Sequence, residues 1–94
     1  MKTDKSAKIQ KAKNIQWKTV NGEAILLRAS GDYYALDAVG TFLWTKISQD
    51  RLSLDDLLNC LMAEYNCNSI QAENDVTEFC NGLIAEKLLD VNAV

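Results

Sequence analysis

Apolar and polar residues alternate along the first part of the chain with the period of a β-strand. The alternation over residues 15–20 predicts a first strand, and Asn21-Gly22 follows it. Asn-Gly between two alternating runs is the strongest short hairpin signal, because both central residues of a type I′ turn need a positive φ. A second strand is predicted over residues 24–29, a turn over 30–32, and a third strand over 33–36. The pattern indicates a three-stranded antiparallel meander whose first and third strands are edges.

The apolar spacing then changes to that of an α-helix. Val39, Leu43 and Ile47 recur at a spacing that lines up one face of a helix. Asp37 precedes this run and is a natural N-cap, because its carboxylate can accept hydrogen bonds from the free backbone N–H groups of the first turn. Residues 33–44 are therefore predicted to form a short aromatic strand that leads directly into a helix.

A second helix is predicted to begin at Ser53. Asp56 occupies the third helical position, which makes a capping box with aspartate in place of glutamate. An unbroken apolar stripe then runs from Leu54 to Tyr65, as expected for a helix that covers a core.

A third helix is predicted from a cap at Asn68 or Ser69 to about Lys87. Residues 88–91 form either its last turn or a short added strand. The apolar positions of this helix can face the core or line a groove, and their spacing does not sort them. These positions are Ala72, Val76, Phe79, Cys80, Leu83 and Ile84.

Basic and acidic residues are separated along the chain. The 94 residues include ten basic and thirteen acidic ones, for a net charge of −3. Residues 1–18 hold six lysines and one acid, a formal charge of +5, whereas the remainder holds four basic and twelve acidic residues, a charge of −8. We expect a flexible basic tail over residues 1–14 and one small folded domain over residues 15–94.

The side chains that most enzymes and metal sites need are scarce. Histidine is absent, so the usual general base near neutral pH is missing. Cys60, Cys67 and Cys80 are an odd number and form no CxxC pair, and without histidine they lack a fourth good zinc ligand. We therefore expect no catalysis, no metal, no cofactor and no disulfide framework, with Cys60 and Cys80 as small buried apolar residues.

The sequence also gives no sign of a membrane protein. No uncharged run approaches the roughly 18 residues of a membrane span, and no apolar stretch follows the first five residues as it would in a signal peptide. We expect a cytoplasmic protein with no membrane partner.

Three groups of residues together share the order and spacing of a known family. They are Tyr34-x-Leu36-Asp37-x-x-Gly40-x-x-x-Trp44, then Ser53-x-Asp55-Asp56-Leu57 with Tyr65, and finally Val76-x-x-Phe79-x-x-x-Leu83. With them, residues 15–91 resemble the PqqD-like family, the small peptide chaperones of pyrroloquinoline quinone biosynthesis. The family often has asparagine where this chain has Asp37, which is a conservative exchange at a helix cap.

The resemblance implies both a fold and a function. The fold is α+β and winged-helix-like, with three strands followed by three helices. The function is that of a RiPP recognition element, which captures the leader segment of a ribosomally made precursor peptide. The domain then presents this peptide to a modifying enzyme, often a radical SAM protein, or to a leader protease.

The resemblance also places the binding site. The leader is expected to add as a strand beside the third strand, in a groove walled by the third helix. The residues expected to bind it are Tyr33, Tyr34, Ala35, Leu36, Ala72, Asp75, Val76, Phe79, Cys80 and Leu83.

The third strand is the less protected of the two edges. Natural edge strands usually carry lysine, proline or a bulge that prevents pairing. Lys18 and the basic tail protect the first strand, whereas residues 33–36 have no such guard. An unguarded edge suits strand addition, although Tyr33 and Tyr34 could instead simply cover the core and its rim. Because such an edge can pair with itself, we expect a monomer or a weak homodimer.

A winged-helix nucleic-acid-binding protein is the alternative, because its topology is similar. Nucleic-acid affinity depends on lysine and arginine at the reading surface. The predicted third helix has Lys87 near its end and four acids along it, Glu73, Asp75, Glu78 and Glu86. We therefore expect no nucleic-acid partner.

Overall fold

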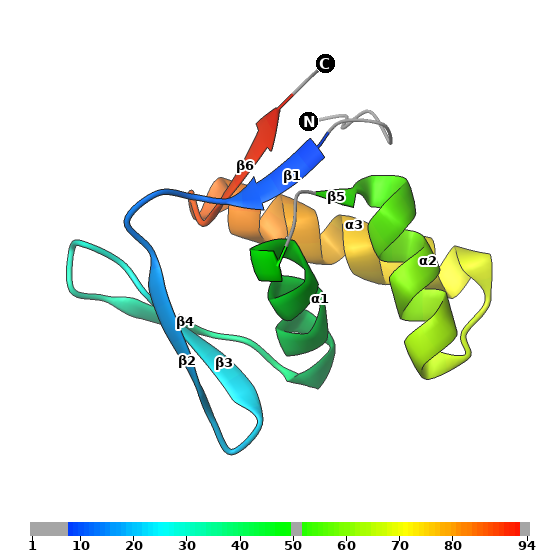
Figure 1. Ribbon diagram of the computed structural model, residues 1–94, viewed down its shortest axis with the longest axis horizontal. Coiled ribbons are helices and arrows are strands. Elements are labelled where there is room, and N and C mark those ends of the chain that lie inside the picture. The colour runs from blue at the N-terminus through cyan, green and yellow to red at the C-terminus, as the bar shows by residue number, and fades with distance from the viewer. Residues whose placement is uncertain (1–7, 50–51, 93–94) are drawn as a thin grey trace.

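The computed structural model describes residues 8–49 and 52–92, which fold into strands on two small sheets and three helices (Figure 1). In chain order the elements are β1 (Lys8–Lys11), β2 (Gln16–Val20), β3 (Glu23–Leu27), β4 (Tyr33–Ala35), α1 (Ala38–Gln49), β5 (Leu52–Ser53), α2 (Leu54–Tyr65), α3 (Ser69–Ala85) and β6 (Leu89–Asn92). The predicted α+β class, with a meander followed by three helices, is confirmed.

The predicted meander is the sheet β2-β3-β4, and both of its pairings are antiparallel. The hairpin between β2 and β3 turns at Asn21 and Gly22, whose φ angles are 54° and 80°. Both are positive, as a type I′ turn requires. The order leaves β4 at an edge of the sheet, as predicted.

A second sheet, β5-β1-β6, was not predicted. The expectation of a flexible tail over residues 1–14 is wrong for Lys8–Lys11, because this segment is β1 and pairs with both β5 and β6. Ile9 is its only large apolar residue, and its side chain is fully buried. Residues 1–7 of the expected tail lie outside the described residues. The choice left open for residues 88–91 is settled in favour of a strand, β6.

The predicted helix caps are confirmed. The Asp37 carboxylate accepts from the Gly40 N–H at 2.8 Å, at the start of α1. Ser53 and Asp56 form a complete capping box on α2. Of the two alternatives for α3, the cap is Asn68.

The core lies where α1 meets the other elements. In Figure 1, α1 lies between the meander and α2, and it contacts β1 and β3 as well as α2. Trp44 of α1 is fully buried, and its ring meets that of Trp17 edge to face with centroids 6.2 Å apart. Among the described residues, no helix combines the length and the apolar character that a membrane crossing needs.

Candidate functional site

The hydrogen-bond register of β4 shows which of its backbone groups are free. The Leu36 N–H donates to the Ala24 carbonyl at 2.9 Å, and the Arg28 N–H donates to the Asp32 carbonyl at 3.0 Å. These two bonds lie at either end of the β3–β4 pairing. In an antiparallel ladder, opposed residues alternate between pairs that exchange hydrogen bonds and pairs that do not.

The residue halfway between these two bonds on β4 is Tyr34, which is opposite Leu26. By the alternation, the backbone groups of Tyr34 face β3, and those of Tyr33 and Ala35 face away from it. Within residues 8–49 and 52–92, no strand pairs with this outer side of β4. The edge therefore presents N–H and C=O groups that are available to another chain.

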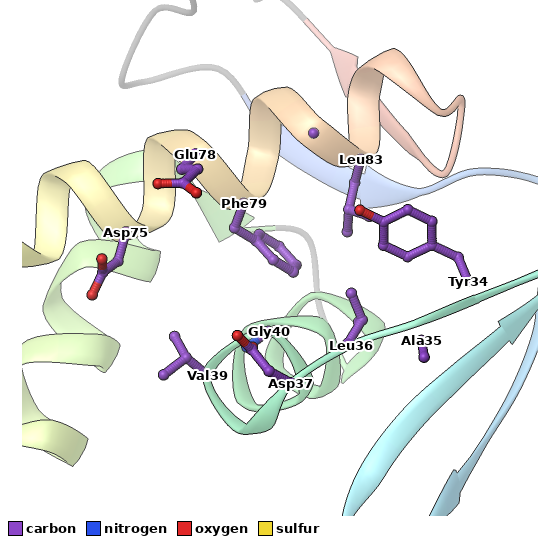
Figure 2. Close-up of a pocket in the computed structure, with 11 residues that line it drawn as sticks. Tyr34, Ala35, Leu36, Asp37, Val39, Gly40, Asp75, Glu78, Phe79 and Leu83 are labelled. Carbon is purple, nitrogen blue, oxygen red and sulfur yellow. The ribbon is translucent and has the colours of Figure 1, made fainter.

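A pocket of about 330 Å³ lies beside this edge. Its walls are β4, the start of α1 and one face of α3 (Figure 2). The lining residues are Tyr34, Ala35, Leu36, Asp37, Val39, Gly40, Asp75, Glu78, Phe79, Gly82 and Leu83.

The floor of the pocket is apolar. The Phe79 side chain points from α3 toward the start of α1, and the Tyr34 ring extends from β4 toward Leu83 (Figure 2). Leu36 and Leu83 are buried beneath them, and Phe79 stays half-buried. Half-buried aromatic rings over buried leucines can accept an apolar side chain from a partner, since covering them removes further apolar surface from water.

The rim of the pocket is acidic. Asp37, Asp75 and Glu78 line it, and it holds no lysine or arginine among the described residues. The Gln71 amide donates to the Asp75 carboxylate at 3.3 Å, and Asp37 caps α1. Neither contact neutralises a charge, so the rim keeps its negative potential.

The comparisons with known proteins agree with this geometry. The family model described as "Coenzyme PQQ synthesis protein D (PqqD)" matches residues 23–89. The chain belongs to the PqqD family. Among solved structures it is similar to "TbiB1 in Complex with the TbiA(beta) Leader Peptide", with a TM-score of 0.78 and 25% sequence identity over 90% of this chain and 99% of that one. No curated protein matches the sequence.

The PqqD match runs from the first residue of β3 to the first residue of β6. All three walls of the pocket, β4, α1 and α3, lie inside it. β1 and β2 precede the match, so the second sheet of this PqqD-family protein is completed by a segment outside the family model.

The structure brings together most of the ten residues expected to bind the leader. Tyr34, Ala35, Leu36, Asp75, Phe79 and Leu83 line the pocket. Tyr33 adjoins them on the opposite face of β4, where its side chain is 69% exposed.

Three of the expected wall residues lie elsewhere. Ala72, Val76 and Cys80 are buried in the core and do not line the pocket, so the expected wall is corrected at these positions. Residues of one apolar stripe point in slightly different directions around the helix axis. Part of the α3 stripe therefore faces the core, and part faces the pocket. The buried part belongs to the hydrophobic core, and α2 and β6 are among the elements that contact α3.

Five lining residues were missed by the sequence analysis as contacts for a peptide, namely Asp37, Val39, Gly40, Glu78 and Gly82. The sequence could have indicated Gly82, because a glycine inside a helix costs about 1 kcal/mol of stability relative to alanine. Its presence there suggests a packing or functional role. An added Cβ at Gly82 would have nothing within 4 Å, whereas one at Gly40 would lie 3.2 Å from the Asp37 Oδ1 atom. The two glycines therefore have different roles: Gly40 allows a close approach, and Gly82 leaves the pocket open.

The remaining candidate chemistry is limited. Within the described part of the chain, no group of three or more histidine, cysteine, aspartate or glutamate residues is arranged to hold a metal ion. All three cysteines are free thiols, and burial raises the pKa of Cys80 to about 12. A thiol that stays protonated is a poor nucleophile.

Proposed function

We propose that this PqqD-family protein binds the leader segment of a ribosomally made precursor peptide and presents the peptide to a modifying enzyme or a leader protease. The observation that carries the proposal is the free edge of β4 directly beside an apolar pocket. The similarity to TbiB1, whose structure was solved with a leader peptide, supports it.

The proposed mode of binding is strand addition. A peptide strand alongside β4 would exchange hydrogen bonds with the backbone N–H and C=O groups of Tyr33 and Ala35, which face away from β3. Alternate side chains of the added strand would then face the pocket, because successive residues of a strand point to opposite faces. Backbone bonds of this kind supply affinity, and the pocket supplies specificity.

The proposed role after binding is presentation. A leader held along β4 leaves the rest of the precursor free to enter the active site of a partner enzyme, such as a radical SAM protein or a leader protease. The domain itself supplies no catalytic group and no cofactor in this scheme, and we place it in the cytosol, where its thiols remain reduced.

The first test locates the bound peptide. The probe is the leader of a short precursor encoded beside the gene for this protein, titrated into the full chain labelled with ¹⁵N. We expect the largest amide shifts in residues 33–36 and on the pocket side of α3, residues 75–83. Largest shifts in α2 instead would show that the peptide binds by another mode.

The second test detects strand addition from the side of the peptide. Each leader residue in turn is N-methylated, which removes one backbone donor without touching the protein. Strand addition predicts that affinity falls at every second residue over the bound segment, because only alternate N–H groups face β4. A loss at consecutive residues, or at none, would contradict the mechanism.

The third test closes the pocket without disturbing the fold. Gly82→Leu adds a side chain where a Cβ meets no atom within 4 Å, and it replaces glycine with a better helix former. We expect the free energy of unfolding to hold or rise, and leader affinity to fall at least about tenfold because the apolar site is filled. Asn81→Leu is the matched control, since Asn81 is an exposed neighbour on α3 outside the pocket. Equal affinity of both variants would contradict binding in the pocket.

The nucleic-acid alternative finds no support in the charge of α3. Asp75 and Glu78 lie on its open face, where a recognition helix would need basic side chains. We expect no electrophoretic shift of duplex DNA at near-physiological salt by a variant that lacks residues 1–7. A sequence-dependent shift by this variant would favour the alternative.

A further inference from the structure

The charge of the pocket rim restricts which peptides fit the groove. Asp37, Asp75 and Glu78 form no ion pair within residues 8–49 and 52–92. We infer that the partner peptide carries a lysine or arginine at this rim, next to an apolar residue that fills the pocket. The inference rests on the proposed function and adds the chemical class of the peptide.

The Asp75 and Glu78 carboxylates lie toward one end of the groove, and that of Asp37 lies nearer its middle, across from Phe79 (Figure 2). Asp37 lies two residues after the last residue of β4, and Asp75 comes from the first half of α3 (Figure 2). The rings of Tyr34 and Phe79 and the side chain of Leu83 form the apolar part (Figure 2). An added strand therefore passes from an apolar region to an acidic one as it approaches the start of α1.

This arrangement predicts an order of residues in the peptide. Every pairing within β2-β3-β4 is antiparallel, and an antiparallel addition continues the sheet with the slightly more stable pattern. The peptide then runs opposite to β4, so its N-terminal part lies at the acidic end. Because side chains facing the pocket recur every second residue, the basic residue belongs two or four positions before the apolar one.

Acidic peptides are poor occupants of the same groove. The N-terminus of α1 could in principle attract an anion, but the Asp37 carboxylate already accepts from the Gly40 N–H there. An aspartate or glutamate on the peptide would therefore meet three like charges, at a helix start that already holds a carboxylate cap.

A second copy of this chain is also disfavoured at β4. Antiparallel addition of a second β4 would place the residue that precedes it, Asp32, at the acidic end of the first copy. Asp32 is already engaged with Arg28, at 3.5 Å, and Arg28 also pairs with Glu86, at 2.8 Å. The arginine is thus shared with two carboxylates of its own chain, and the contact between copies remains repulsive.

The test begins with selection from a displayed library of random twelve-residue peptides on the full-length protein. Peptides are retained when they shift the amides of residues 33–36. We expect enrichment of lysine or arginine two or four positions before a large apolar residue. Enrichment of acidic residues, or no preference in charge, overturns the inference and leaves the proposed function standing. If no peptide shifts these amides, the proposed function fails and the inference fails with it.

Charge variants then assign the preference to the rim. The double variant Asp75→Asn/Glu78→Gln should bind the best basic peptide about three- to tenfold more weakly, because each exposed ion pair contributes modestly. The matched control is Glu64→Gln/Asp90→Asn, which removes the same charge from exposed positions outside the pocket. A peptide with norleucine in place of the basic residue should bind wild type and both variants equally. The inference is overturned if both double variants weaken the basic peptide alike, because the effect would then come from net charge alone.

Discussion

At the residue scale, two glycines on opposite walls of one pocket have different structural roles. Gly40 of α1 permits the start of the helix to approach the end of β4, where a Cβ would meet Asp37 and Leu36 atoms at 3.2 and 3.3 Å. Gly82 of α3 faces open space. Gly40 is therefore needed for close packing, whereas Gly82 keeps the pocket open.

Gly40→Ala and Gly82→Ala should accordingly change stability in opposite directions. Both gain up to about 1 kcal/mol of helix propensity, but at Gly40 the new methyl group crowds the carboxylate cap, and overpacking of this kind costs about 1–3 kcal/mol. We expect Gly40→Ala to lower the free energy of unfolding by about 1 kcal/mol and Gly82→Ala to raise it. Chemical denaturation measures both, and a gain for both variants would contradict the close approach.

The buried Cys80 thiol should resist modification in the native protein. Its side chain is 2% exposed, and burial raises its pKa to about 12, so it remains a thiol at pH 8. Cys60 and Cys67 are half-buried. With iodoacetamide and mass spectrometry at pH 8, we expect Cys80 to react only at the rate of unfolding. Modification of Cys80 at the rate of a free peptide thiol would contradict its position in the core.

At the element scale, local caps decide where the helices begin. The α2 capping box satisfies two backbone N–H groups, those of Ser53 and Asp56, with side chains three residues apart. Asp37 and Asn68 act in the same way on α1 and α3. Such contacts depend on neighbouring residues alone, which is why the sequence pattern located them.

The capping box should make stability depend on pH. The Ser53 backbone N–H, which donates to the Asp56 carboxylate, lowers the pKa of Asp56 below its ordinary value of 3.8. A group whose pKa is lowered in the folded state stabilises the protein at pH values above its ordinary pKa. This stabilisation is lost as the pH falls through the folded-state pKa. Asp56→Asn should therefore be less stable than wild type at pH 7, by a few tenths to about 1 kcal/mol. Denaturation across pH should show the difference vanish in acid, and a constant difference would contradict the role of the charge.

At the scale of the whole molecule, the fold depends on contacts between distant segments. β1, at the start of the described chain, is the central strand between β5 and β6. β1 also contacts α1, so the N-terminal segment belongs to the core that supports the groove.

Ile9→Ala should therefore destabilise the domain as a core substitution does. Ile9 is 0% exposed, and removing a buried isoleucine side chain to alanine costs about 2–5 kcal/mol. Lys11→Ala, at an exposed position of the same strand, is the matched control and should change stability by less than about 0.5 kcal/mol. Thermal and chemical denaturation measure both. Equal stability of the two variants would show that β1 is not part of the cooperative fold.

The sequence by itself determined the features that arise between close neighbours. The Asn21-Gly22 turn, the caps at Asp37 and Ser53 and the edge position of β4 follow from local backbone chemistry and from the order of the strands. The resemblance to PqqD-like proteins supplied the groove between β4 and α3, and six of the ten expected residues line the pocket found there.

Only the tertiary structure decided which residues of a shared pattern face which partner. Val76 and Phe79 lie on one apolar stripe, but Val76 is in the core and Phe79 lines the pocket, because the elements packed around α3 bury only part of the stripe. Ile9 likewise had no periodic signal in a lysine-rich segment, since its strand is stabilised by pairing with residues some forty and eighty positions away. Hydrophobic burial is not directional, so a sequence can show that a side chain will be buried without showing against what.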